Sequence, residues 1–190
     1  MDALLSVCLG LGLAAACGFR VFVPALVLSL AARGGYVALD GSFEWIASTA
    51  ALITLGVATL VEVTAYYVPW LDNLLDTLSS PAAVVAGIVV TASVVTGIDP
   101  YLKWTLAVIA GGGVAGAVQA LTVGARGASS LTTAGVGNPL VTTAEIGGSA
   151  LLSGIAVGAP WLAALAVLAL VFFAARRLRR RRPRLPSGPA

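Results

Sequence analysis

The sequence predicts an all-α fold, a polytopic bundle of about six transmembrane helices, and three observations carry this prediction. Of the 190 residues, 59% are hydrophobic and 10% are charged, whereas soluble domains carry roughly 25% charged residues. The mean hydropathy is +1.00. The apolar residues also form blocks of about 20, the length that crosses a bilayer as a helix. These values exclude a soluble globular domain and predict a polytopic membrane protein.

The chain is expected to divide into one transmembrane domain, residues 1–175, and a basic tail, residues 176–190. At about 150 residues per domain, the length allows a single domain. The Arg/Pro-rich tail is expected to be disordered, and the positive-inside rule places it in the cytoplasm. We expect no nucleic-acid partner. The tail arginines are expected to contact anionic head groups of membrane lipids, and they are Arg176, Arg177, Arg179, Arg180, Arg181, Arg182 and Arg184.

Histidine is absent, which removes the commonest general base and the commonest transition-metal ligand. The two cysteines, Cys8 and Cys17, lie on different faces of an apolar helix and have no partner spacing for zinc. We therefore expect no enzymatic activity, no metal site and no cofactor.

The first apolar run, residues 4–32, is too long for one straight helix. At 1.5 Å per residue it would extend about 43 Å, against about 30 Å of hydrocarbon. We expect a break between Gly18 and Arg20, where a glycine, a charge and the nearby Pro24 weaken the helix. Six crossings would place both termini in the cytoplasm. The other five predicted segments are residues 45–68, 81–96, 101–124, 139–158 and 160–173.

Three ionisable residues fall within the predicted segments: Arg20, Glu62 and Glu145. Placing a charge in lipid costs on the order of 2.5–3.5 kcal/mol even on a mild scale, so each is a candidate for solute or ion binding. Arg20 needs a carboxylate partner. Either both glutamates share Arg20 in a structural bridge, or one remains to couple to a proton or a cation. Arg126 is assigned to a loop on the cytoplasmic side.

Two further groups of polar residues are candidates for the same half of the membrane. Asp72, Asn73 and Asp76 lie in a predicted short amphipathic helix before the third segment, as a solvated face or as a cation site. Asn138 is expected to cap the fifth segment, with a proline at the first helical position. The glycines beside Asn138 can also present backbone N–H groups to an anion.

Several short motifs along the chain resemble those of one known family. They are Ala15-Ala16-Cys17-Gly18-Phe19-Arg20-Val21-Phe22-Val23-Pro24, Glu62, Pro69-Trp70-Leu71-Asp72-Asn73-Leu74-Leu75-Asp76 and Gly137-Asn138-Pro139. The family is domain of unknown function 4126 (DUF4126), and the resemblance covers nearly the whole chain short of the tail. It implies a multi-pass protein of the bacterial inner membrane without an established activity, with candidate residues at the family's motif positions.

Two functions fit these observations. The first is a transporter or channel for a small solute or ion, with a polar site in the cytoplasmic half of the membrane. The alternative is a non-catalytic membrane scaffold or assembly factor, in which the buried charges form structural ion pairs. Small residues at close-packing spacing favour tight packing within one chain, with a homo-oligomer as the other interpretation.

Overall fold

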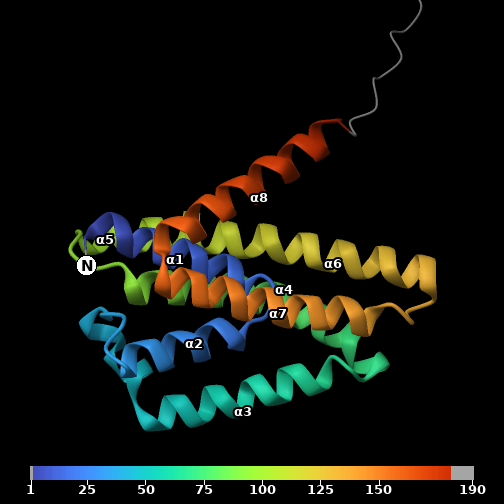
Figure 1. Ribbon diagram of the computed structural model, residues 1–190, viewed down its shortest axis with the longest axis horizontal. Helices are drawn as coiled ribbons and strands as arrows, with labels where there is room; N and C mark the ends of the chain where they lie inside the picture. The colour runs from blue at the N-terminus through green and yellow to red at the C-terminus, as the bar shows by residue number, and fades with distance from the viewer. Residues whose placement is uncertain (1, 181–190) are drawn as a thin grey trace, which may run out of the picture.

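Most of the long helices run along one common direction, and α8 leaves the bundle at an angle to them (Figure 1). The computed structural model describes residues 2–180, and the side chains of residues 69–74, 76, 174, 175 and 177–180 lie outside that description. No strand occurs in the described range, so the prediction of an all-α fold is confirmed. The elements are α1 (Ala3–Cys17), α2 (Phe22–Arg33), η1 (Gly41–Ala47), α3 (Thr49–Ala65), α4 (Pro69–Val94), α5 (Pro100–Leu106), η2 (Ala107–Gly112), α6 (Gly113–Thr133), α7 (Asn138–Gly158) and α8 (Pro160–Arg180).

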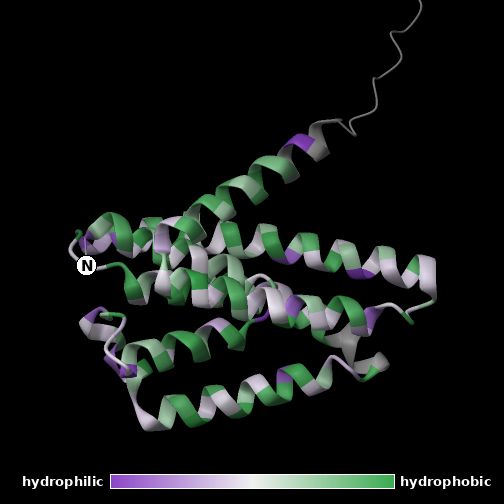
Figure 2. Ribbon diagram, in the orientation of Figure 1, coloured by the Kyte–Doolittle hydropathy of each residue, from purple (hydrophilic) through white to green (hydrophobic). Residues whose placement is uncertain are grey.

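Among the described residues, three helices are long and apolar enough to cross a membrane. The short helix η1 and α3 are bent by 64° at their junction and make a fourth span if they are taken together. Three shorter apolar helices are Ala3–Cys17, Phe22–Arg33 and Pro160–Phe173. Hydrophobic residues occur along the length of every helix, while hydrophilic residues occur mainly in the loops and at a few positions within the helices (Figure 2). The predicted number of about six spans is not confirmed.

The first apolar run breaks where the sequence predicts, because α1 ends at Cys17 and α2 begins at Phe22. It does not cross as one bent segment, however. The Thr91 hydroxyl near the end of α4 donates to the Gly10 carbonyl in α1, and the Asp40 N–H beyond α2 donates to the Ser93 carbonyl. The start of α1 and the end of α2 therefore lie at the same end of the bundle, as Figure 1 shows.

The bundle has two ends, which we call the Asp99 end and the Asn138 end. The Asp99 end comprises the loops of residues 34–40 and 95–99, and the Asn138 end comprises the turns of residues 66–68 and 134–137. The α1–α2 hairpin enters from the Asp99 end and returns to it. The break therefore reverses the direction of the chain, whereas a single crossing would require the chain to continue to the opposite end of the bundle.

Helix α1 lies at the centre of the packing, where α4, α7 and α8 surround it. Leu9 and Leu13 are fully buried there with a run of alanines. Small residues allow this close approach: a Cβ on Gly12 would lie 2.7 Å from the side chains of both Ala156 and Ala163. The predicted close packing of small residues therefore occurs within the chain around α1.

Two predicted helix boundaries between residues 81 and 133 are wrong. Pro81 lies inside α4 and does not begin a helix, and residues 69–80 belong to the same helix as the predicted third segment. In lipid, a backbone group that is not hydrogen-bonded is costly, so a helix tends to continue through a proline. Helix α6 also continues to Thr133 instead of ending near Gly124, and it includes Arg126.

Helix α8 continues to Arg180 and so includes residues 176–180, the first part of the predicted tail. The rest of the tail, residues 181–190, lies outside the described residues.

Helix α4 crosses the π-helical turn η2 at two facing glycines. A Cβ on Gly87 would lie 2.5 Å from the Ala115 side chain and 2.8 Å from the Gly111 carbonyl oxygen. Neither neighbour can move without displacing a helix backbone. The close approach of the two helices therefore requires glycine at position 87, since any side chain there would clash.

We expect Gly87→Ala to destabilise the protein by about 1–3 kcal/mol, the usual effect of overpacking a tight core. Gly154→Ala is the matched control, because nothing lies within 4 Å of a Cβ there and alanine is the better helix former. The measurement is the thermal-unfolding midpoint of each purified variant. Equal midpoints for the two variants would contradict the packing described here.

Candidate functional site

Arg20 lies in the break between α1 and α2, and its side chain is turned into the bundle. The residue is 1% exposed. Its Nη2 donates to Glu145 Oε2 on α7 over 2.8 Å. The prediction that a buried carboxylate accompanies Arg20 is confirmed in this geometry, and the partner is Glu145.

Arg126 on α6 reaches the same carboxylate. Its Nε donates to Glu145 Oε1 over 3.0 Å, and its Nη2 donates to Oε2, the oxygen that Arg20 also contacts. Arg126 is 4% exposed, so its assignment to a loop is wrong. The sequence does contain a pattern that would have placed Arg126 in a helix. Gln119, Thr122 and Arg126 have helical spacing, and these three polar residues share one buried face of α6.

The ring of Tyr66 packs against both guanidinium groups. Its ring centroid is 3.7 Å from Cζ of Arg20 and 4.3 Å from Cζ of Arg126. A cation over an aromatic face is attracted by the ring quadrupole, and more strongly when water is excluded. The Tyr66 hydroxyl donates to Ser79 Oγ on α4 over 3.0 Å, and Gln119 Nε2 donates to the same oxygen over 3.1 Å. The ring therefore links α3, α4 and α6 to the charges.

Glu62 does not share Arg20 with Glu145. Its Oε1 accepts the Val21 N–H over 2.8 Å and its Oε2 accepts the Phe22 N–H over 3.0 Å. These are the first N–H groups of α2, and a carboxylate is favourable there because the N-terminus of a helix carries a partial positive charge. Glu62 is the carboxylate that has no direct ion pair with either arginine, and it is 7% exposed.

Three buried polar atoms of the site have no hydrogen-bond partner among the described residues. They are Nε and Nη1 of Arg20 and Oγ1 of Thr142. Thr142 lies three residues before Glu145 on α7 and so on the same face of that helix. A buried donor without a partner costs about 1–3 kcal/mol, and more when it is charged. These atoms are therefore candidates for binding a hydrogen-bonding solute.

We name the group formed by Arg20, Tyr66, Arg126 and Glu145, with Glu62 beside it, the arginine cluster. Its formal charges sum to zero when both carboxylates are ionised. A cavity of about 230 Å³ between α6, α7 and α8 has Glu145 in its wall. A second cavity of about 440 Å³ between α2, α3 and α4 has Glu62 and Tyr66 in its wall.

The other sequence candidates lie apart from these contacts or outside the description. Asn138 begins α7, but its side chain does not cap the helix. Its Nδ2 donates instead to Ser130 Oγ on α6 over 3.1 Å, so the predicted cap is wrong. The side chains of Asp72, Asn73 and Asp76 lie outside the described part of the structure, and their backbone belongs to α4.

Helices of this length and apolar composition are compatible with a polytopic α-helical membrane protein. The family model for a domain of unknown function, DUF4126, matches residues 7–180, and the chain belongs to that family. No curated protein matches the chain, and no solved structure matches it.

We expect Glu145→Gln to destabilise the protein by about 3–5 kcal/mol, because the substitution removes the buried carboxylate charge that pairs with both Arg20 and Arg126. Glu44→Gln is the control. This side chain is exposed, and exposed substitutions usually change stability by less than about 0.5 kcal/mol. Thermal unfolding of both variants tests this, and a Glu145→Gln variant as stable as the wild type would show that the ion pairs do not hold the helices.

Proposed function

We propose that this protein transports a small anionic solute across the bacterial inner membrane and that the solute binds at the arginine cluster. The observation that carries the proposal is the pair of buried Arg20 donors, Nε and Nη1, without a partner among the described residues. A solute with carboxylate or phosphate-like oxygens would satisfy them, since guanidinium groups bind such oxygens with strong hydrogen bonds. Thr142 offers a hydroxyl on the same side of α7.

The charges support coupling to a proton or to another cation. An anion added to a cluster of zero formal charge would leave one negative charge in a medium of low dielectric, which is unfavourable. A proton on Glu62 would restore neutrality, and Glu62 lines the cavity of about 440 Å³. The proposal assigns no covalent chemistry to these residues and so no enzymatic activity.

Arg20 is enclosed in this conformation, so transport requires opening towards each side. The cavity beside Glu145 and the cavity beside Glu62 approach the cluster from different helices. Broken helices around a polar centre are the arrangement in which transporters expose a site alternately. The α1–α2 hairpin supplies such a break at Arg20.

Binding can be tested by a thermal-shift screen of the wild type against chloride, phosphate and acetate across a range of pH. A ligand at about 100 times its Kd stabilises the folded state by about 2.7 kcal/mol. We expect such a shift in the wild type and in Arg176→Gln, which loses an exposed arginine, but not in Arg20→Gln. Glu62→Gln should bind without dependence on pH, because the amide stands for the protonated acid.

The second candidate function is the non-catalytic scaffold, and one observation favours it. Both oxygens of Glu145 are engaged by arginines, as a purely structural bridge requires. If no ligand shifts the wild type and Arg20→Gln fails to fold, the cluster acts as a structural centre and the transport proposal is wrong.

We also propose a topology that differs from six crossings. The positive-inside rule favours the cytoplasm for the arginines from Arg176 onward, at the end of α8 and beyond it, and we therefore assign the Asn138 end to the cytoplasm. Because the α1–α2 hairpin returns to the Asp99 end, the first residues would face the opposite side, and α3, α4, α5–α6, α7 and α8 would make five crossings.

Reporter fusions test this topology. We expect a reporter before residue 3 and a reporter after residue 40 on the same, outer side, and reporters after residues 68 and 136 in the cytoplasm. Opposite sides for the first two positions would restore the six-crossing arrangement and contradict a hairpin that returns.

A further inference from the structure

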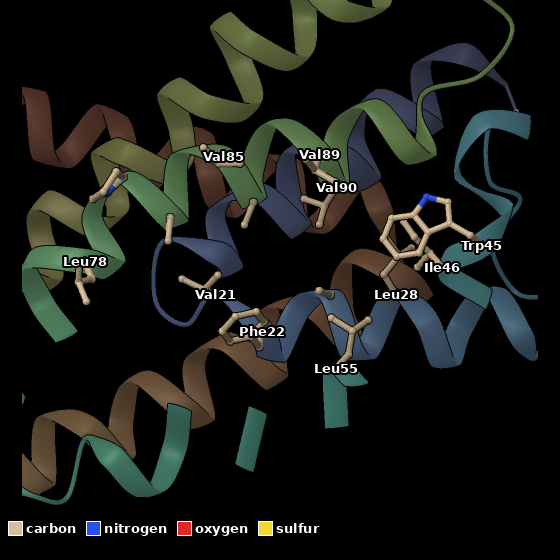
Figure 3. A pocket seen from close by; sticks show the side chains of 14 residues that line it. Val21, Phe22, Leu28, Trp45, Ile46, Leu55, Leu78, Val85, Val89 and Val90 are labelled. Carbon is tan, nitrogen blue, oxygen red and sulfur yellow. The ribbon is translucent and has the colours of Figure 1, made fainter. Parts of the chain in front are cut away.

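A groove between α2, α3 and α4 extends from Val21 and Phe22 to Trp45, and Arg20 is not among the residues of its wall. It is a cavity of about 520 Å³, within the range of about 300–1,000 Å³ typical of sites for small ligands. Figure 3 shows Val85, Val89 and Val90 of α4 facing Val21 and Phe22 at the start of α2. Its lining is apolar throughout, so a polar solute would gain nothing there.

The groove has the length of a hydrocarbon chain in one leaflet. Its α4 wall runs from Leu78 to Val90, and the twelve helical steps between them correspond to about 18 Å at 1.5 Å per residue. Half the hydrocarbon thickness of a bilayer is about 15 Å. Several lining residues are also open to the outside, since Val85 is 59% exposed and Leu78 is 58% exposed. A chain can therefore enter from the side, from the bilayer itself.

One end of the groove carries groups that suit a phospholipid head. Trp45 and Ile46 close this end (Figure 3), and the indole N–H of Trp45 has no hydrogen-bond partner in the described part of the chain. Arg33 contacts the chain four residues beyond Trp45, where its Nη1 donates to Thr49 Oγ1 over 2.8 Å at the start of α3. Ser29, one turn before Arg33, donates to the Ile46 carbonyl over 2.6 Å.

The polar groups at one end of the groove and the apolar length behind them follow the order of a phospholipid's own parts. A cationic side chain and an indole donor at the mouth match a phosphate and an ester oxygen, and the apolar length behind them matches the attached chain. Close packing also requires an occupant, since an unfilled apolar gap loses dispersion contacts on both of its walls. We propose that the groove binds one acyl chain of a membrane phospholipid, with the phosphate at Arg33 and Trp45.

The test is native mass spectrometry of the full chain purified with added phosphatidylethanolamine carrying palmitoyl and oleoyl chains. We expect one phospholipid retained per chain. Ala82→Trp and Ala25→Trp fill the groove from opposite walls and should each lower the retained fraction by about tenfold or more, as a lost binding site would. Arg33→Gln should lower it about two- to fivefold, the range of an exposed ion pair.

Ala117→Trp is the matched control, because Ala117 is exposed on α6 and outside the groove. It should retain the phospholipid as the wild type does. Two tryptophan variants on different walls keep the test decisive if one of them fails to fold. A wild type that retains no phospholipid, that retains free palmitate in its place, or that both groove variants match would overturn the proposal. None of these results depends on whether anions bind at Arg20.

Discussion

The rest of the structure depends on one carboxylate, that of Glu145, held between two buried guanidinium groups. An arginine in an apolar bundle is tolerated only with a partner, and two arginines on different elements can share one partner only if those elements meet. Glu145 therefore joins α7 to α6 through Arg126 and to the break between α1 and α2 through Arg20. The positions of three elements follow from a single electrostatic requirement.

Polar contacts hold both ends of helix α3, and one of these ends contacts the arginine cluster. At the Asn138 end, Tyr66 stacks against both arginines and donates to Ser79. At the Asp99 end, Thr49 accepts a hydrogen bond from Arg33. Between these points an apolar groove separates α3 from much of α4. Helix α3 packs mainly against α2, where Glu62 also accepts the Val21 and Phe22 N–H groups, and its few contacts with α4 leave one side of α3 exposed.

The sequence predicts the features that depend on local chemistry. A run too long for one span, with a glycine and a charge in its middle, has to break, and Arg20 has to find a carboxylate. The direction of α2 after the break is not local, because it depends on how α1 packs against α4. Pro81 is a helix breaker in water, but lipid makes any interruption of the backbone costly. The helical position of Arg126 is hard to predict, because the small polar residues after it have the composition of a loop although they continue helix α6.

The broken helix also links the two charges of the proposed transport cycle. Glu62 occupies the N-terminus of α2, where it accepts the Val21 and Phe22 N–H groups, and Arg20 lies one residue before Val21. A proton on Glu62 removes the negative charge that those N–H groups favour, and the freed positive end of α2 then favours an anion beside Arg20. Proton and anion would bind together because one helix end serves both. In the proposed cycle, the charge of Glu62 would therefore set the affinity of Arg20 for an anion.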